Sequence, residues 1–207
     1  MIPRIVRGPA PKKTYTDGSY RKAIEYLLRD SGGRCAYSMQ HEQLAGGRKC
    51  MEVDHFKPKG KNRHRYSNFL PATRHCNGAK SQTWPTSAEQ RAGLRFLDPA
   101  VEQDYGLHIF EDPRTHELVG ATREGRFQIE MCDLNAPHLV RERKDRSDIM
   151  RVLENTPVTV KSEGTPSAKS FTSTLDAFSA SFRALQRELA LKIPSIPPPP
   201  DSIPFPD

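Results

Sequence analysis

The sequence predicts an α+β protein with several helices, one short strand and a small β-hairpin. Apolar residues alternate with polar ones over Met51–Phe56, which predicts a strand. The segments Leu107–Glu111 and Leu118–Ala121 flank the turn sequence DPRT, which predicts a hairpin. Apolar residues at helical spacing occur both before and after these strands, so helices are expected on either side of them.

The composition indicates an intracellular protein with a polyanionic partner. A chain of 207 residues is one moderate domain with appendages, and its 35% apolar content and 18 prolines predict a modest core. The net charge of +7 suits nucleic acid, because Lys and Arg replace its condensed counterions. No apolar run approaches the ~20 residues of a membrane span. The N-terminus lacks a signal-peptide apolar region. We therefore expect a cytoplasmic protein without membrane contact, and cysteines that are thiols or metal ligands rather than disulfides.

The N-terminal segment predicts an extended arm followed by a helix. Residues 1–18 are basic and proline-rich. Ser19 is a suitable N-cap, and Tyr20, Ile24, Leu27 and Leu28 fall on one helical face. Gly32 and Gly33 should end this helix after Asp30.

The stretch from Met51 to Lys80 carries the residues with hydrolytic chemistry. Pro58 and Gly60 should end the strand and start a basic loop. Ser67 is a good N-cap, so Phe69 and Leu70 are expected to begin a helix. This order of strand, loop and helix would bring four polar side chains onto one compact unit: Asp54, His55, Asn68 and Asn77.

These residue types suit metal-assisted cleavage of a phosphodiester. Asp54 offers a hard oxygen ligand for Mg²⁺ or Mn²⁺, and the amide oxygen of Asn77 can supply a second. His55 titrates near neutral pH and can take a proton from an attacking water. Neighbours in a strand point to opposite faces, so Asp54 and His55 can share a site only where the strand ends or bulges.

The order Asp54-His55, then Asn68, then CNGAK at residues 76–80 resembles the HNH endonucleases and their ββα-metal finger. The last HNH position is Asn77 rather than His, as in the HNH domain of RNA-guided CRISPR nucleases. The resemblance implies that His55 is the general base, that Asp54 and Asn77 hold the metal, and that Asn68 braces the loop carrying His55. The phrases CAYS, VDHFKPK, YSNFLPATRHCNGAK and CDLNAPHLVRERK resemble small HNH nucleases of bacterial anti-phage systems, Septu-like and retron-associated.

Basic side chains crowd this segment, and beside a phosphodiester site they favour phosphate positioning over a merely solvated loop. For the last of them, support of the final helical turn is an alternative. The candidate nucleic-acid-binding residues are Lys57, Lys59, Lys61, Arg63, Arg65, Arg74 and Lys80.

The sequence does not favour a structural zinc site. Many HNH proteins carry two Cys pairs here, whereas this chain keeps Cys35 and Cys76 but has Ser38 and Thr73 at the other two positions. Hydroxyls are poor zinc ligands beside thiolates, so packing of two buried thiols is favoured. Cys35 and Cys76 remain the residual candidates, with His41 or His75 as substitute ligands.

The C-terminal half should be mainly helical. A short helix is expected over Ala88–Leu94. Glu124–Asp133 fits either a strand or a helix by periodicity, and the family resemblance favours the helix. Asn135 should cap a helix over about Pro137–Glu154, whose central residues 141–146 carry mixed charge and predict a solvated face.

The last third predicts an appended helix and tail. Residues 155–170 have linker composition, and residues 193–207 are proline-rich and should be disordered or bound in a groove. Between them, a helix over residues 171–192 carries an apolar seam at alternating spacings of four and three. The apolar seam consists of Phe171, Leu175, Phe178, Phe182, Leu185 and Leu189. We thus expect a nuclease domain over 1–154, with the finger core at about 34–82.

The sequence predicts a metal-dependent DNA endonuclease of anti-phage defence. RNA cleavage is one alternative, and a non-catalytic nucleic-acid-binding subunit is another. The resemblance implies a partner such as an ABC-type ATPase. The sequence shows no Gly-x-x-x-x-Gly-Lys run, so any control by ATP must come from another chain. Self-association through the seam is equally open, as is docking of the seam on its own domain.

Overall fold

The computed structural model describes residues 3–155, 166–193 and 195–200, and of residues 155 and 166–176 the backbone alone. Its strands are β1 (Met51–His55), β2 (Phe69–Thr73), β3 (Ile109–Glu111) and β4 (Leu118–Gly120). Its α-helices are α1 (Ile24–Asp30), α2 (Arg74–Lys80), α3 (Ser87–Arg91), α4 (Arg123–Met131), α5 (Pro137–Asn155) and α6 (Pro166–Lys192). Short 3-10 turns occur at η1 (Tyr20–Ala23), η2 (Arg48–Cys50) and η3 (Tyr66–Asn68).

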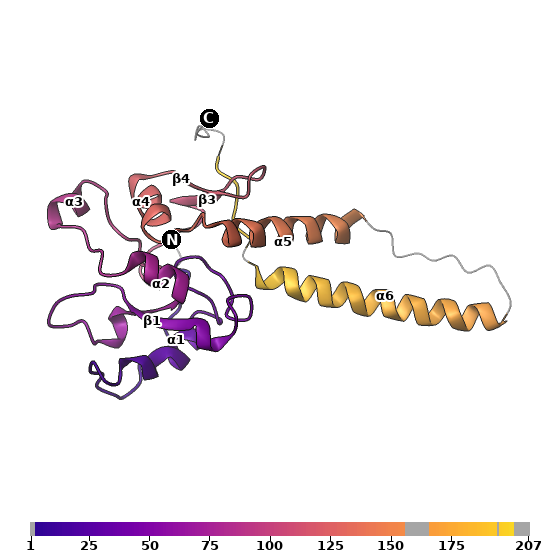
Figure 1. Ribbon diagram of the computed structural model, residues 1–207, viewed down its shortest axis with the longest axis horizontal. Coiled ribbons are helices and arrows are strands. Elements are labelled where there is room, and N and C mark those ends of the chain that lie inside the picture. The colour runs from indigo at the N-terminus through magenta and orange to yellow at the C-terminus, as the bar shows by residue number, and fades with distance from the viewer. Residues whose placement is uncertain (1–2, 156–165, 194, 201–207) are drawn as a thin grey trace.

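The predicted α+β class is confirmed. β1 pairs with β2 and β3 pairs with β4, giving two separate antiparallel two-stranded sheets among the helices. The sheets and the first four α-helices form a rounded body, from which α5 and α6 extend side by side (Figure 1). None of the helices described combines the length and apolar character that crossing a membrane requires.

The central unit is β1–β2–α2 rather than strand, loop and helix. The strand expected at Met51–Phe56 is confirmed and ends at His55. The prediction that a helix begins after Ser67 is wrong, because Phe69–Thr73 is a fully buried strand. A short apolar run of this kind has the same pattern in a buried strand and in a helix start, and pairing with β1 decides for the strand. α2 follows at once, capped by the Thr73 hydroxyl, which accepts from the Cys76 amide.

The β1–β2 sheet has different surroundings on its two faces. Phe69 packs with Leu27 and Val53 on the α1 side. Leu70 packs with Tyr37 and other buried residues on the opposite side. The register pairs His55 with Phe69 and Asp54 with Leu70, so each site residue begins on a different face.

The N-terminal helix forms where it is expected but is capped differently. It starts as the 3-10 turn η1 and continues as α1 to Asp30. The Ser19 hydroxyl accepts from the Thr16 amide at 2.9 Å instead of capping the helix. Ile5 is buried, and its amide donates to the Pro99 carbonyl, so the preceding arm lies over the domain.

The hairpin expected around DPRT is confirmed as β3–β4, and the short helix expected near Ala88 is confirmed as α3. Residues 123–131 are helical, as α4. α4 lies so close to the hairpin that a Cβ on Gly125 would fall 2.2 Å from the His108 carbonyl oxygen. Glycine is therefore required there.

α5 has the expected bounds, but two expectations about it are wrong. Asn135 does not cap it, because its side chain accepts from the Leu118 amide at 2.7 Å and donates to the Leu118 carbonyl at 3.0 Å. The charged centre is not wholly solvated either. Arg143 is buried and donates to the His116 carbonyl at 2.6 Å, and Arg146 pairs with Glu111. These contacts fix α5 on the hairpin.

The C-terminal helix is longer than predicted. α6 begins at Pro166, so residues 166–170 of the predicted linker are helical. Residue 155 of that linker is the last residue of α5, and residues 156–165 lie outside the described part. Ser, Thr and Lys resemble linker composition but are compatible with a helix. The tail segment 195–200 packs against the body. Ile196 is buried, and the Pro197 carbonyl accepts from the Glu111 amide at 3.0 Å. Residues 201–207 are outside the described part.

Candidate active site

A polar cleft of about 240 Å³ lies at the end of β1. Its lining residues are Tyr20, Val53, Asp54, His55, Pro58, Asn77, Gly78, Ser81 and Gln82. Asp54 and His55 start on opposite faces of the sheet, but the strand ends there and both border the same cleft. α2 supplies Asn77 from the other wall. Three of the four predicted chemical residues therefore meet.

Asp54 is a buried carboxylate held by two buried donors. The Lys80 ammonium lies 3.1 Å from Oδ1 and 3.0 Å from Oδ2, and the Tyr37 hydroxyl donates to Oδ2. Burial and the neighbouring Asp54 raise the pKa of Tyr37, so its hydroxyl stays protonated and remains a donor. A carboxylate offers about four lone-pair positions, and three contacts leave one for a cation.

Lys80 is not placed to contact phosphate, contrary to the first expectation for it. Its side chain is fully buried, and besides Asp54 it donates to the His55 carbonyl at 3.1 Å. The cause is the desolvation cost of the Asp54 carboxylate, which a buried ammonium offsets. Lys80 therefore fixes both the carboxylate and the backbone of the adjacent histidine.

His55 is half-buried among aromatic rings at the mouth of the cleft. Its ring lies 4.7 Å from the Tyr20 ring and 5.0 Å from the Phe69 ring, measured between centroids. Its Nε2 lies 3.2 Å from Nδ1 of His64, whose Nε2 lies 3.2 Å from Asp17. Burial, and then the neighbouring His64, lower the pKa of His55 below the ordinary 6.5. His55 is accordingly neutral at pH 7 and able to accept a proton.

Asn77 is oriented by a residue that the sequence did not single out. Its Nδ2 donates to Glu52 Oε2 at 2.6 Å, and Glu52 in turn pairs with Arg74 at 3.1 Å. The oxygen and nitrogen of an amide point in opposite directions, so this contact directs Oδ1 away from Glu52. That oxygen is the atom suited to a cation.

Asn68 lies outside the cleft lining and holds the loop next to it. Its Oδ1 accepts from the Lys57 amide, while its Nδ2 donates to the carbonyls of Lys57 and Arg63, all at 3.0 Å. Its own carbonyl accepts from the Phe56 amide. The side chain thus ties the two ends of the basic loop to the end of β1.

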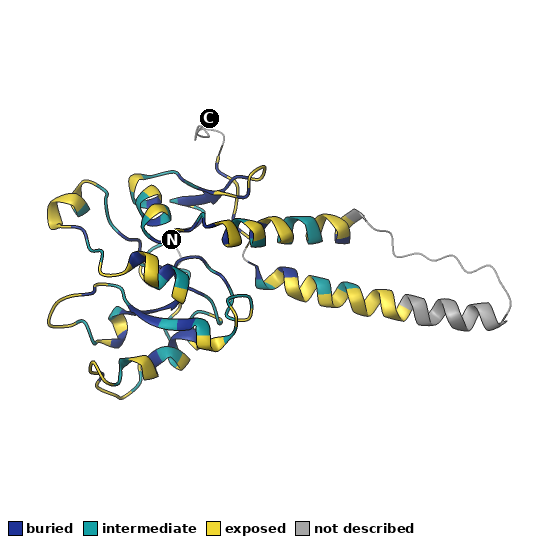
Figure 2. Cartoon of the chain, in the orientation of Figure 1, coloured by how far each residue is buried: buried dark blue, intermediate teal, exposed yellow. Residues whose placement is uncertain are grey.

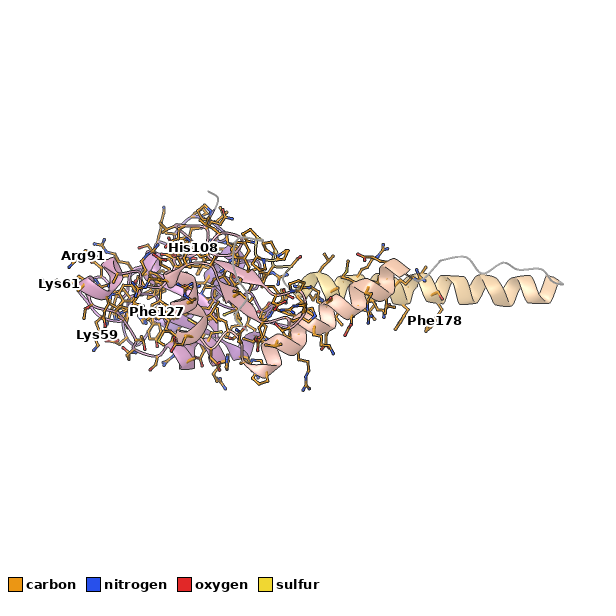
Figure 3. The ribbon with its side chains drawn as sticks, turned by 90° about the horizontal axis from the view of Figure 1, so that it is seen from above. Lys59, Lys61, Arg91, His108, Phe127 and Phe178 are labelled. Atoms are coloured by element: carbon orange, nitrogen blue, oxygen red, sulfur yellow. The ribbon has the colours of Figure 1, made fainter. Side chains whose placement is uncertain are left out.

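The basic loop encloses a second hollow, of about 370 Å³. Five of the predicted phosphate-contacting residues line it: Lys57, Lys59, Lys61, Arg63 and Arg65. Lys59 and Lys61 lie at the end of the molecule farthest from the α5–α6 arm (Figure 3). Arg74 is exposed but engaged by Glu52, at the start of α2. The phosphate backbone of a nucleic acid lying along this loop would meet a concentrated positive charge.

The zinc-knuckle positions form a buried hydrogen-bonded cluster. Cys35 Sγ accepts from the Thr73 amide at 3.4 Å, and Ser38, Thr73 and Cys76 are buried around it. Burial raises the pKa of Cys35, but hydrogen bonds from Cys76 and Ser38 outweigh it and lower that pKa. The pKa of Cys76 is raised by the same contact with Cys35 and by burial. The Thr73 hydroxyl lies 3.8 Å from Cys35 Sγ and accepts from the Cys76 amide, so hydroxyls complete the cluster.

Three residues of the site were missed from the sequence. Tyr37 lies in the phrase CAYS, Glu52 stands two positions before Asp54 on the same strand face, and His64 lies within the basic loop. The period of two could have identified Glu52. The contacts of Tyr37 and His64 depend on chain segments brought together only by folding.

The donor set fits a weakly held hard cation. Among the residues described, no three or more His, Cys, Asp or Glu side chains are grouped to hold a metal ion. One carboxylate oxygen and one amide oxygen suit Mg²⁺, which keeps several waters and takes further ligands from substrate phosphate.

Comparisons with protein-family models, with curated proteins and with solved structures found no match for this chain.

Proposed function

We propose that this protein is a metal-dependent DNA endonuclease of the HNH type, and that β1, β2 and α2 are its ββα-metal finger. The observation that carries the proposal is the cleft at the end of β1. There a buried carboxylate, a neutral histidine and an oriented amide meet, in the order that the sequence motif prescribes. The resemblance to small anti-phage nucleases further suggests a role in defence, with a separate ATPase chain supplying any control by ATP.

His55 performs the proton transfer in this proposal. Its lowered pKa leaves the imidazole unprotonated at neutral pH, and its position on the cleft wall allows it to take a proton from a water. His64 holds Nε2 of His55, so Nδ1 is the nitrogen left for the water. Asp54 and Asn77 would hold Mg²⁺, which when bound stabilises charge on the phosphate and on the leaving oxygen.

The basic loop supplies the binding energy for the substrate. It adjoins the cleft through Pro58 and presents its lysines and arginines around the second hollow. Contacts of this kind position a phosphate backbone without selecting bases. Binding and cleavage should consequently weaken with rising salt.

Purified protein should nick plasmid DNA only when Mg²⁺ or Mn²⁺ is present. Asp54→Asn and Asn77→Ala should each shift the metal titration to higher concentration, because the first removes the negative charge of one oxygen ligand and the second removes the other oxygen ligand. Asp54→Asn is preferable to Ala, since the amide still accepts from Tyr37.

Gln43→Ala, which removes an exposed amide elsewhere, is the matched control and should titrate like the parent. Overlapping titrations for parent and both site variants would refute the ligand assignment. Matched RNA and DNA duplexes, run in parallel, separate the two substrates. Binding of DNA without any metal-dependent cleavage would instead favour a binding subunit.

The rate of cleavage should rise with pH and level off with a midpoint below 6.5, because only neutral His55 accepts a proton and burial lowers its pKa. Removing His64 removes the second cause of that shift, so in His64→Ala the midpoint should move to higher pH. In His64→Ala, the turnover rate should fall more than the affinity for DNA. Nitrogen-15 NMR of His55 measures the same pKa directly, without activity. An unchanged midpoint in His64→Ala would show that the two rings are not coupled.

A further inference from the structure

The α5–α6 arm exposes apolar side chains that its own body does not cover. Of the apolar seam, the four members whose side chains are described are all exposed: Phe178 (69%), Phe182 (51%), Leu185 (62%) and Leu189 (42%). Met150 and Val152 on α5 are exposed as well. Figure 2 shows most of the described part of α6 as exposed, and Figure 3 places Phe178 about midway along the arm, outside the body.

The base of α6 is firmly attached, so the seam is held out from the body. Arg34 donates to the carbonyls of Leu191 and Lys192 at 2.7 and 2.6 Å, satisfying the last turn of the helix. Ile193 and Ile196 are buried just beyond it. Residues at the end of α6 thus attach it to the body, while the four described members of the seam remain exposed.

We propose that the seam is the interface with a second copy of this chain. Spacings of four and three repeat every seven residues, which is the pattern that meshes with a helix carrying the same repeat. The rings of Phe178 and Phe182 are stacked nearly parallel, 6.4 Å apart between centroids, so the seam presents two neighbouring aromatic rings. An identical helix offers the matching surface.

The charges beside the seam permit close approach of two copies. The flanking positions carry Ser179, Ser181 and Gln186, which are uncharged. Glu188 is neutralised within its own helix by Lys192 at 2.9 Å. The strongly basic loop lies at the far end of the molecule from Phe178, so pairing of the arms does not bring two basic loops into contact through the seam.

The area available for pairing comes mainly from α6. At 1.5 Å per residue, α6 with 27 residues is about 40 Å long. A face about 10 Å wide along it offers roughly 400 Å² per copy, to which the exposed Met150 and Val152 of α5 add. Standard interfaces bury about 800 Å² per partner, so we expect a dimer whose formation depends on concentration.

The test is sedimentation velocity of the full chain, at roughly 1 and 100 µM. The parent should be a dimer at the higher concentration. Phe178→Ser with Phe182→Ser should weaken the dimer by about 100-fold, equivalent to about 2.8 kcal/mol. Val101→Ser with Leu107→Ser, which removes two exposed apolar side chains elsewhere, is the matched control and should leave the dimer intact.

A parent that is monomeric at both concentrations overturns the proposal, as does a dimer that survives the double substitution at Phe178 and Phe182. Thermal melting of the same variant separates a surface from a core. An unchanged melting temperature of the monomer agrees with an exposed seam, whereas a large fall means that the seam packs on its own chain. Because the seam lies away from the cleft, the monomeric double variant should still nick DNA. If the parent protein itself showed no nicking, that result would contradict the nuclease proposal and leave the dimer proposal unaffected.

Discussion

Replacement of His55 by alanine should lower the rate of metal-dependent DNA cleavage by about 10²–10⁴-fold, the usual contribution of a general base. The ring borders the cleft and its Nε2 is engaged by His64, so the substitution removes the proton acceptor without opening the core. DNA affinity should change little, because the basic loop is retained. Single-turnover nicking and a binding isotherm measure the two quantities separately.

His108→Ala is the matched control, since it removes an imidazole whose partner is Thr122, away from the cleft. This variant should cleave like the parent. If His55→Ala retained a rate within about threefold of the parent at equal metal and pH, His55 would not be the base. Equal losses in both variants would point to a general effect on folding.

Replacement of Lys80 by alanine should destabilise the protein by about 3–5 kcal/mol, because it leaves a buried carboxylate without its counter-ion. Asp54 and Lys80 have side-chain exposures of 4% and 0%, so the loss of the ammonium leaves the carboxylate largely desolvated and without its counter-ion. The His55 carbonyl loses its donor at the same time. Chemical denaturation measures the change in the free energy of unfolding.

Lys12→Ala, a change at an exposed lysine, should alter stability by no more than about 0.5 kcal/mol. Combining Lys80→Ala with Asp54→Asn should recover part of the lost stability, because the unpaired charge is then gone. The ion pair has no structural role if the double variant is as unstable as the sum of the two single variants.

The sequence by itself determined the elements that depend on local pattern. Alternation located β1, the turn residues located the β3–β4 hairpin, helical periodicity located α1, and the proline at the first turn located α5. It also selected Asp54, His55 and Asn77, since a carboxylate, an imidazole and an amide at these spacings carry recognisable chemistry. Local patterns are informative here because they depend on neighbours a few residues apart.

The tertiary structure alone decided what depends on distant partners. β2 became a strand because β1 pairs with it, although its own residues fit a helix start. Lys80 became a buried counter-ion because the fold encloses Asp54 and must offset its charge. Tyr37, Glu52 and His64 entered the site through contacts with residues 9 to 25 positions away along the chain. Desolvation and hydrogen-bond geometry exist only once these segments meet, and a linear pattern contains neither.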